Sequence, residues 1–68
     1  MSTTATYTVT GMTCEHCVKA VTEEISALAG VESVDVVLET GLVTVTSGQP
    51  LAVDDVRAAV DEAGYDLA

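Results

Sequence analysis

The residues of this chain best suited to chemistry are two cysteines, Cys14 and Cys17, with a single histidine, His16, between them. A thiolate is both a soft ligand and a strong nucleophile, so a Cys-x-x-Cys pair can bind a metal ion or act as a redox dithiol. The pair follows an alternating segment, residues 5–10, and precedes an amphipathic segment that begins at Val18. We therefore expect a strand-to-helix turn, where unpaired amides and the helix dipole lower the pKa of at least one cysteine.

The number of available ligands indicates which metal ion such a pair can bind. A structural zinc site normally has four protein ligands, usually two pairs of Cys or His. Two cysteines and one histidine cannot complete that shell. Cu(I) accepts soft thiolates, so spacing and donor count favour Cu(I) bound by Cys14 and Cys17. The alternative from another functional class is a dithiol oxidoreductase. Against it, the chain is short for a thioredoxin-like fold, and no Trp or Pro flanks the cysteines.

Two segments of the chain resemble a known family. Residues 11–17, Gly-Met-Thr-Cys-Glu-His-Cys, resemble the Gly-Met-Thr/Ser-Cys-x-x-Cys signature of heavy-metal-associated domains, and residues 63–65, Ala-Gly-Tyr, are similar to the end of bacterial members. The family comprises soluble copper chaperones and the N-terminal domains of copper-exporting P-type ATPases. The resemblance covers nearly the whole chain, and it implies a Cu(I) carrier, not an enzyme, whose metal ligands are Cys14 and Cys17.

The same resemblance implies roles for three neighbouring residues. Met12 is expected to point inward and support the loop rather than bind metal, as suits a flexible apolar side chain. Tyr65 is expected near the cysteines, at a position that is usually Lys in eukaryotic chaperones. Positions between the two cysteines vary and usually face solvent in the family. His16 is therefore expected outside the metal site, and a role in tuning thiolate charge or exchange stays open.

The expected partner follows from the resemblance as well. It is the metal-binding domain of a copper-transporting P-type ATPase, or another copper protein, which would receive the ion through a shared three-coordinate intermediate. We expect a monomer without metal, and a copper-bridged dimer stays open. Two further readings keep the same fold and thiolate chemistry: an excised N-terminal domain of such an ATPase, and a mercury-binding protein.

Composition narrows the function further. The 68 residues predict one domain, residues 1–68, and a chain of this size buries only about 60% of its unfolded surface. It contains no Phe or Trp, so we expect closely packed layers of small and β-branched side chains rather than a pocket for an organic substrate. The net charge of −9 excludes nucleic acid and anionic lipid as partners. It serves solubility, and docking onto a basic patch of a partner stays open.

The cysteine count and the N-terminal residues predict a cytoplasmic location. A secreted protein of this size would normally carry more than two cysteines, and a reducing cytoplasm keeps both thiols free. Residues 1–6 have neither the basic start nor the apolar centre of a signal peptide. The apolar runs are far shorter than a bilayer requires, so no membrane insertion is expected.

Apolar periodicity predicts six elements. Period-two alternation gives strands, apolar spacings of three and four give helices, and glycines mark their ends. The expected order is a strand at 5–10, a helix at 17–28 that ends by Gly30, strands at 31–38 and 42–46 joined by a hairpin at 39–41, a helix from about Ala52, and a strand at 65–67. This order predicts a ferredoxin-like βαββαβ sandwich, with a four-stranded antiparallel sheet and two helices on one face.

Overall fold

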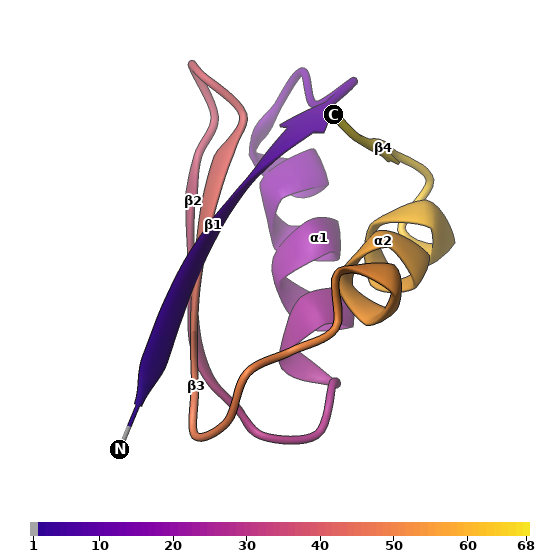
Figure 1. Ribbon diagram of the computed structural model, residues 1–68. Coiled ribbons are helices and arrows are strands. Elements are labelled where there is room, and N and C mark those ends of the chain that lie inside the picture. The colour runs from indigo at the N-terminus through magenta and orange to yellow at the C-terminus, as the bar shows by residue number, and fades with distance from the viewer. Residues whose placement is uncertain (1) are drawn as a thin grey trace.

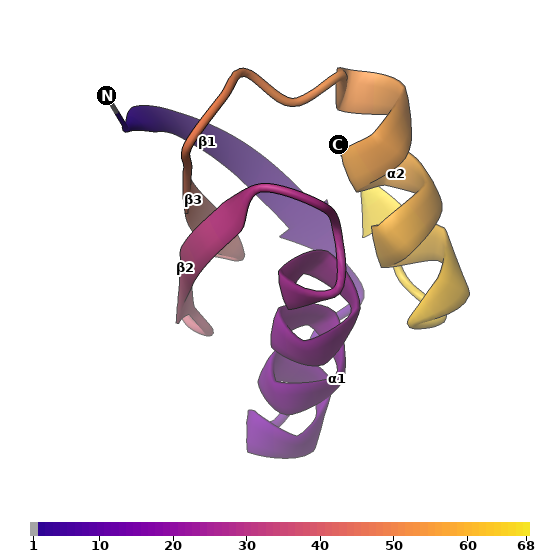
Figure 2. The ribbon, with the colours of Figure 1, turned by 90° about the horizontal axis from the view of Figure 1, so that it is seen from below.

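The computed structural model describes residues 2–68 and arranges them as one sheet covered by two helices. The elements are β1 (Thr3–Thr10), α1 (Glu15–Ser26), β2 (Val31–Val37), β3 (Leu42–Ser47), α2 (Val53–Glu62) and β4 (Asp66–Leu67). The strand order is β2-β3-β1-β4, and every neighbouring pair is antiparallel. Both helices lie on the same side of the sheet, as Figures 1 and 2 show. The predicted ferredoxin-like βαββαβ sandwich is confirmed.

The core forms where the apolar faces of β1 and β3 meet the apolar stripes of the two helices. Its largest fully buried side chains are all β-branched: Val21, Ile25, Val43, Val45, Val56 and Val60. Burying one such side chain contributes about 1.5–3 kcal/mol, so this small set is the main source of stability. On the opposite face of the sheet, Thr6 and Thr8 of β1 are exposed, as their alternation with Tyr7 and Val9 predicts.

The first helix begins and ends earlier than its apolar spacing predicts. The Cys14 carbonyl accepts hydrogen bonds from the N–H groups of Cys17 and Val18, at 3.0 and 3.3 Å, so helix geometry begins at Glu15. Glu15 and His16 are polar and exposed, and apolar periodicity cannot detect such residues. At the other end the helix stops at Ser26.

The predicted left-handed glycine after this helix lies in the loop to β2 instead of at the helix end. The residue that follows the helix, Ala27, keeps right-handed helical angles, and Leu28 belongs to the turn rather than to the helix. Gly30 has a φ of +88°, and its carbonyl accepts a 2.8 Å hydrogen bond from Gly48 N–H. Gly30 therefore shapes the entry to β2 and does not cap α1.

The β2–β3 hairpin is held against β1 through Gly41. Its N–H donates to Val37 and its carbonyl accepts from Val9, both at 2.8 Å. Gly41 has a φ of +74°, and a Cβ at this position would collide with the Val9 carbonyl oxygen. The hairpin predicted at residues 39–41 is confirmed. Leu38, predicted in the preceding strand, belongs to the turn, since the turn must reverse the chain before Gly41 can reach β1.

The second half of the chain ends in a very short strand. α2 begins after Ala52, which provides no side-chain cap, and Asp54 and Asp55 lie in its first turn, where the helix dipole favours negative charge. Gly64, with a φ of +93°, then turns the chain into β4, whose two residues pair with the end of β1. Across residues 2–68, no helix has the length and apolarity needed to cross a membrane.

Candidate metal centre

Both cysteines lie at one end of the molecule, where β1 passes into α1. The connecting loop contains Gly11, whose φ of +92° favours glycine, and a Cβ there would only touch the Tyr65 ring at 3.5 Å. The β2–β3 hairpin and β4 lie at the same end of the fold (Figure 1). The strand-to-helix turn predicted for Cys14 and Cys17 is therefore correct, and two other segments of the chain lie at the same end.

The two sulfur atoms are close but differ in exposure. Cys14 is the residue before α1, in extended geometry, and it is exposed; Cys17 lies in the first turn of the helix and is buried. Residues three apart share one helix face, and the two Sγ atoms are 3.6 Å apart with both thiols free. Because metal–thiolate bonds are about 2.3 Å long, a spacing of this size lets both sulfurs reach one ion.

The surroundings of Cys17 stabilise its thiolate form. Its pKa is lowered to about 6, first by a backbone hydrogen bond from Thr13 and then by hydrogen bonding from the Tyr65 side chain, against the opposing effect of burial. The hydroxyl of Thr13 also lies 3.9 Å from the Cys17 sulfur. Hydrogen bonds to a charged sulfur stabilise the thiolate, which is the form that binds soft metals. The expected lowering of at least one cysteine pKa therefore falls on Cys17.

Tyr65 reaches the cysteines from the far end of the sequence. Its N–H donates to the Val60 carbonyl at 3.1 Å, which holds the residue directly after α2, and its side chain is half-buried. The pKa of Tyr65 is raised, chiefly by its hydrogen bond to Cys17, because the Cys17 thiolate favours the protonated phenol as a donor. The expectation from family resemblance that Tyr65 lies near the cysteines agrees with this structure.

The other residues of the motif have separate positions. Met12 is half-buried and packs against the core cluster, as expected for a residue that supports the loop. His16 is exposed on the first turn of α1. In the part of the chain that the structure describes, no group of three or more His, Cys, Asp and Glu side chains could hold a metal ion together. Within residues 2–68, the candidate metal site is therefore the pair of cysteine sulfurs.

The sequence pattern indicated neither the contact of Thr13 with Cys17 nor the contact of Gly41 with Val9. Thr13 is part of the motif, but its backbone contact with Cys17 depends on how the loop folds back over the first turn of α1. Gly41 was expected only as a turn residue. The close approach of Gly41 to Val9 fixes the end of β1 just before the loop that leads to the cysteines.

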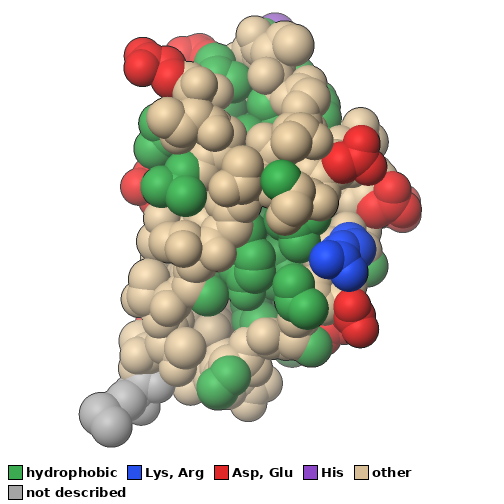
Figure 3. Space-filling model, turned by 45° about the horizontal axis from the view of Figure 1, so that its top comes forward, with side chains coloured by type: hydrophobic (Ala, Val, Ile, Leu, Met, Phe, Trp, Pro, Cys, Tyr) green, Lys and Arg blue, Asp and Glu red, His purple; other side chains and the backbone are tan. Residues whose placement is uncertain are grey.

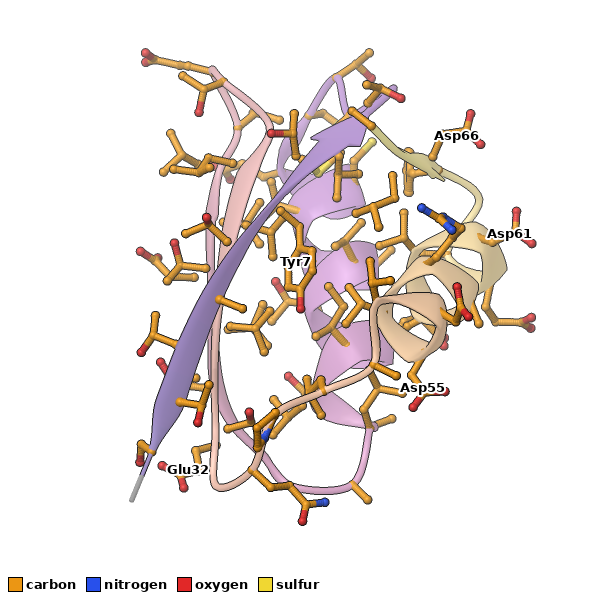
Figure 4. All side chains as sticks on the ribbon, viewed as in Figure 1. Tyr7, Glu32, Asp55, Asp61 and Asp66 are labelled. Atoms are coloured by element: carbon orange, nitrogen blue, oxygen red, sulfur yellow. The ribbon has the colours of Figure 1, made fainter. Side chains whose placement is uncertain are left out.

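Acidic side chains dominate the surface around this end. Glu15 lies in the first turn of α1, where it complements the dipole, and Asp66 of β4 points outward with Asp61 of α2 (Figure 4). The two basic residues of the chain are Lys19 and Arg57. Arg57 lies 3.6 Å from Asp54 in an exposed ion pair that contributes little to stability.

The comparisons with known proteins agree with one another on the family. The family model for the heavy-metal-associated domain matches residues 6–66. The copper chaperone CopZ of Bacillus subtilis is 44% identical over 64 residues, which cover 93% of each chain.

Two solved structures also have this fold. Oxidized MerP from Ralstonia metallidurans has a TM-score of 0.87 at 36% identity, covering 100% of this chain and 96% of that one. The N-terminal domain of a potential copper-translocating P-type ATPase from Bacillus subtilis, in its Cu(I)-loaded state, has a TM-score of 0.86 at 31% identity, covering 98% and 85%. All three proteins match over most of this chain.

Proposed function

Because the chain belongs to the heavy-metal-associated domain family, we propose that it is a Cu(I) carrier that holds the ion between Cys14 and Cys17 and passes it to another copper protein. The observation that carries this proposal is the pair of free sulfurs 3.6 Å apart, one of them with a pKa of about 6. A thiol of that pKa is mainly thiolate at neutral pH, so Cys17 binds a soft ion without first losing a proton. The similarity to a copper chaperone supports copper as the cargo.

The donor set favours Cu(I) over zinc. Two thiolates suit a soft monovalent ion, whereas zinc sites use four ligands or three ligands and a water. His16 is exposed, and the nearest hydroxyls, those of Thr13 and Tyr65, are neutral at physiological pH. The proposed ligands are therefore Cys14 and Cys17 alone.

The different exposure of the two sulfurs suggests the order of transfer. An incoming partner thiolate meets exposed Cys14 first and forms a three-coordinate ion together with Cys14 and Cys17. Cys14 then leaves the ion, and a second thiolate of the partner replaces Cys17, which releases the ion last because it is buried. Thr13 and Tyr65 stabilise the Cys17 thiolate that remains. No protein bond breaks in these steps, and ligand exchange alone moves the metal, so the protein acts as a carrier and not as an enzyme.

The partner that fits best carries the same kind of site. A domain with its own exposed Cys-x-x-Cys can offer the incoming thiolate, and similarity to the N-terminal domain of a potential copper-translocating ATPase supports such a partner. Cytoplasmic delivery to that ATPase is part of this proposal, since free thiols persist in a reducing compartment. Two alternatives keep the same chemistry: an excised ATPase domain, and a mercury carrier, which the likeness to MerP supports.

A dithiol oxidoreductase is the candidate function from a different class. The 3.6 Å sulfur separation and the lowered pKa of Cys17 also suit a reversible disulfide, because thiolate attack forms that bond. Such an enzyme would reduce a substrate disulfide while its own two cysteines are oxidised. An insulin-reduction assay with thioredoxin as the positive control decides this: turnover by the metal-free protein supports the oxidoreductase, and no turnover removes it.

A competition titration tests the proposed carrier. The reduced protein is titrated with Cu(I), and separately with Zn(II), against a chelator of known affinity for each ion. We expect about one Cu(I) per monomer at low loading, with a strong preference for Cu(I) over Zn(II). Cys14→Ser and Cys17→Ser should both lose tight binding, because a serine hydroxyl is neither soft nor ionised at neutral pH. Tight zinc binding by the wild-type protein, or tight Cu(I) binding by both serine variants, would refute the two-thiolate site.

A further inference from the structure

The edge of β1 that faces β4 is only partly paired. β4 pairs with the last two residues of β1, and the N–H of Ala68, just after β4, donates to the Thr8 carbonyl at 2.8 Å. β1 itself begins at Thr3. From Thr3 to Tyr7, therefore, no strand within residues 2–68 pairs with this edge.

The hydrogen bonds show which backbone groups face this open edge. The Val9 N–H donates to Gly41 on the β3 side, whereas the Thr8 carbonyl accepts from the β4 side. In an antiparallel strand, successive residues direct both their N–H and C=O to alternate edges. Thr4 and Thr6 therefore direct theirs away from β3, where an added strand could pair with them.

A groove lies between α2 and β4, the strand that pairs with the end of this edge. It is a hollow of about 440 Å³ lined by Asp54, Arg57, Ala58, Asp61, Tyr65, Asp66 and Leu67, and we call it the α2–β4 groove. Figure 3 shows hydrophobic surface between β1 and the charged side chains of α2, and Tyr7 points from β1 toward the helices (Figure 4). A strand added to the open edge would thus cover apolar surface while it makes backbone hydrogen bonds.

The charged side chains at the rim of the α2–β4 groove favour a cationic occupant. Three carboxylates line it, from Asp54, Asp61 and Asp66, against one guanidinium that already lies 3.6 Å from Asp54. The whole chain carries a net charge of −9. Two copies of this chain would repel one another at such an interface, whereas a cationic chain would be attracted to it.

We propose that an extended basic segment of a partner protein pairs with the backbone of Thr4 and Thr6, antiparallel to β1 and in line with β4, and lies against the α2–β4 groove. Apolar side chains on one face of that segment cover the floor of the groove, and its Lys or Arg side chains meet the carboxylates of α2. The backbone pairing is at Thr4 and Thr6, and neither cysteine lines the groove, so the contact needs no bound metal. It gives the carrier a second point of attachment to its partner.

The experiment uses the metal-free protein and an alternating Lys-Val hexapeptide, capped at both ends, with an alternating Glu-Val hexapeptide as the control. Amide NMR shifts give the affinity, and hydrogen exchange gives the protection of individual amides. We expect the Lys-Val peptide to bind, to protect the Thr4 and Thr6 amides, and to bind Cys14→Ser equally well. The Glu-Val peptide should bind at least about tenfold more weakly because of charge repulsion.

Two pairs of variants locate the contact. Thr6→Pro removes the N–H that faces the open edge while it spares the bonds to β3, and Thr6→Val keeps that N–H. We expect Thr6→Pro to bind the Lys-Val peptide about tenfold more weakly than Thr6→Val does. The double variant Asp54→Asn with Asp61→Asn should weaken binding of the Lys-Val peptide and not binding of the Glu-Val peptide. Equal binding by the two Thr6 variants, equal binding of the two peptides, or no binding would overturn the proposal. Protection of the Thr6 amide that grows with protein concentration alone would show a second copy as the occupant, and would overturn it too.

Discussion

The Cys14 and Cys17 sulfur atoms lie 3.6 Å apart, yet the first is exposed and the second is buried. Their separation lets them share one ion, and their difference in exposure makes them unequal in exchange. Hydrogen bonding from Thr13 and Tyr65 reaches Cys17, which is the cysteine with the lowered pKa. In the proposed carrier, Cys14 is thus the accessible ligand and Cys17 the anchoring one.

The thiolate of Cys17 should make stability depend on pH. Its pKa falls from 9.0 to about 6 on folding, so the thiolate stabilises the metal-free fold fully above pH 9 and loses this effect as pH falls through 6. Urea unfolding of reduced wild-type protein and Cys17→Ala should therefore show a stability difference in favour of wild type that grows from pH 6 to pH 9. Parallel profiles across that range would show that the Cys17 pKa is not lowered.

Replacing Tyr65 by Phe should raise the pKa of Cys17. The change removes a hydroxyl that donates to the thiolate and keeps the ring that lies beside Gly11. Ultraviolet absorbance of the thiolate during a pH titration measures the shift, and the fold should persist. Tyr7→Phe is the matched control, since Tyr7 lies on β1 and packs against the core. An unchanged titration in Tyr65→Phe would mean that the Tyr65 hydroxyl does not lower the pKa of Cys17.

His16→Ala should leave the stoichiometry of Cu(I) binding unchanged. His16 is exposed on the first turn of α1, so its loss should alter the rate of exchange at most. The chelator competition described for the serine variants reports the affinity, and stopped-flow transfer to a chelator reports the rate. If His16→Ala lowers affinity as much as Cys14→Ser does, the site has three donors, Cys-Cys-His, and zinc must be reconsidered.

Gly41→Ala should destabilise the protein more than Gly64→Ala does. Both glycines have positive φ, at +74° and +93°, where a Cβ costs about 1–2 kcal/mol. At Gly41 the new Cβ also meets the backbone carbonyl of Val9, whereas at Gly64 it meets nothing within 4 Å. Urea midpoints of the two variants measure the difference. Equal midpoints would show that the hairpin can move away from β1 at little cost.

Copper transfer to a partner with a basic surface should slow as salt is added. The net charge of −9 speeds encounter with such a partner, and ions screen that attraction over about 10 Å at 0.1 M salt. Transfer rates measured between low and high ionic strength check this, with transfer to a small neutral chelator as the control. A flat profile for the protein partner would leave solubility as the role of the acidic surface.

The sequence by itself determined the order of the elements and which residues form the candidate site. Alternation in residues 5–10 correctly predicted which side chains of β1 face the core, and spacing did so for Val56 and Val60 of α2, because these periods follow from strand and helix geometry. Val53, which has the same spacing, is 48% exposed at the start of the helix. Two cysteines three positions apart at the end of a strand predicted a paired thiolate site, which stays a prediction. Apolar spacing predicted the two ends of α1 less accurately. The helix begins with Glu15 and His16, which are exposed and carry no apolar signal, and the apolar spacing continues to Leu28 although the helix ends at Ser26.

Tertiary structure decided what surrounds the cysteines. Hydrogen bonding between Tyr65 and Cys17 joins residues from opposite ends of the chain, and periodicity carries no information about such pairs. The contact of Gly41 with Val9 likewise exists only because β3 pairs with β1. The strand order β2-β3-β1-β4, with a β4 of two residues, leaves the β4-facing edge of β1 partly unpaired within residues 2–68. These features arise when distant segments bury one core together, so they depend on packing and not on local sequence.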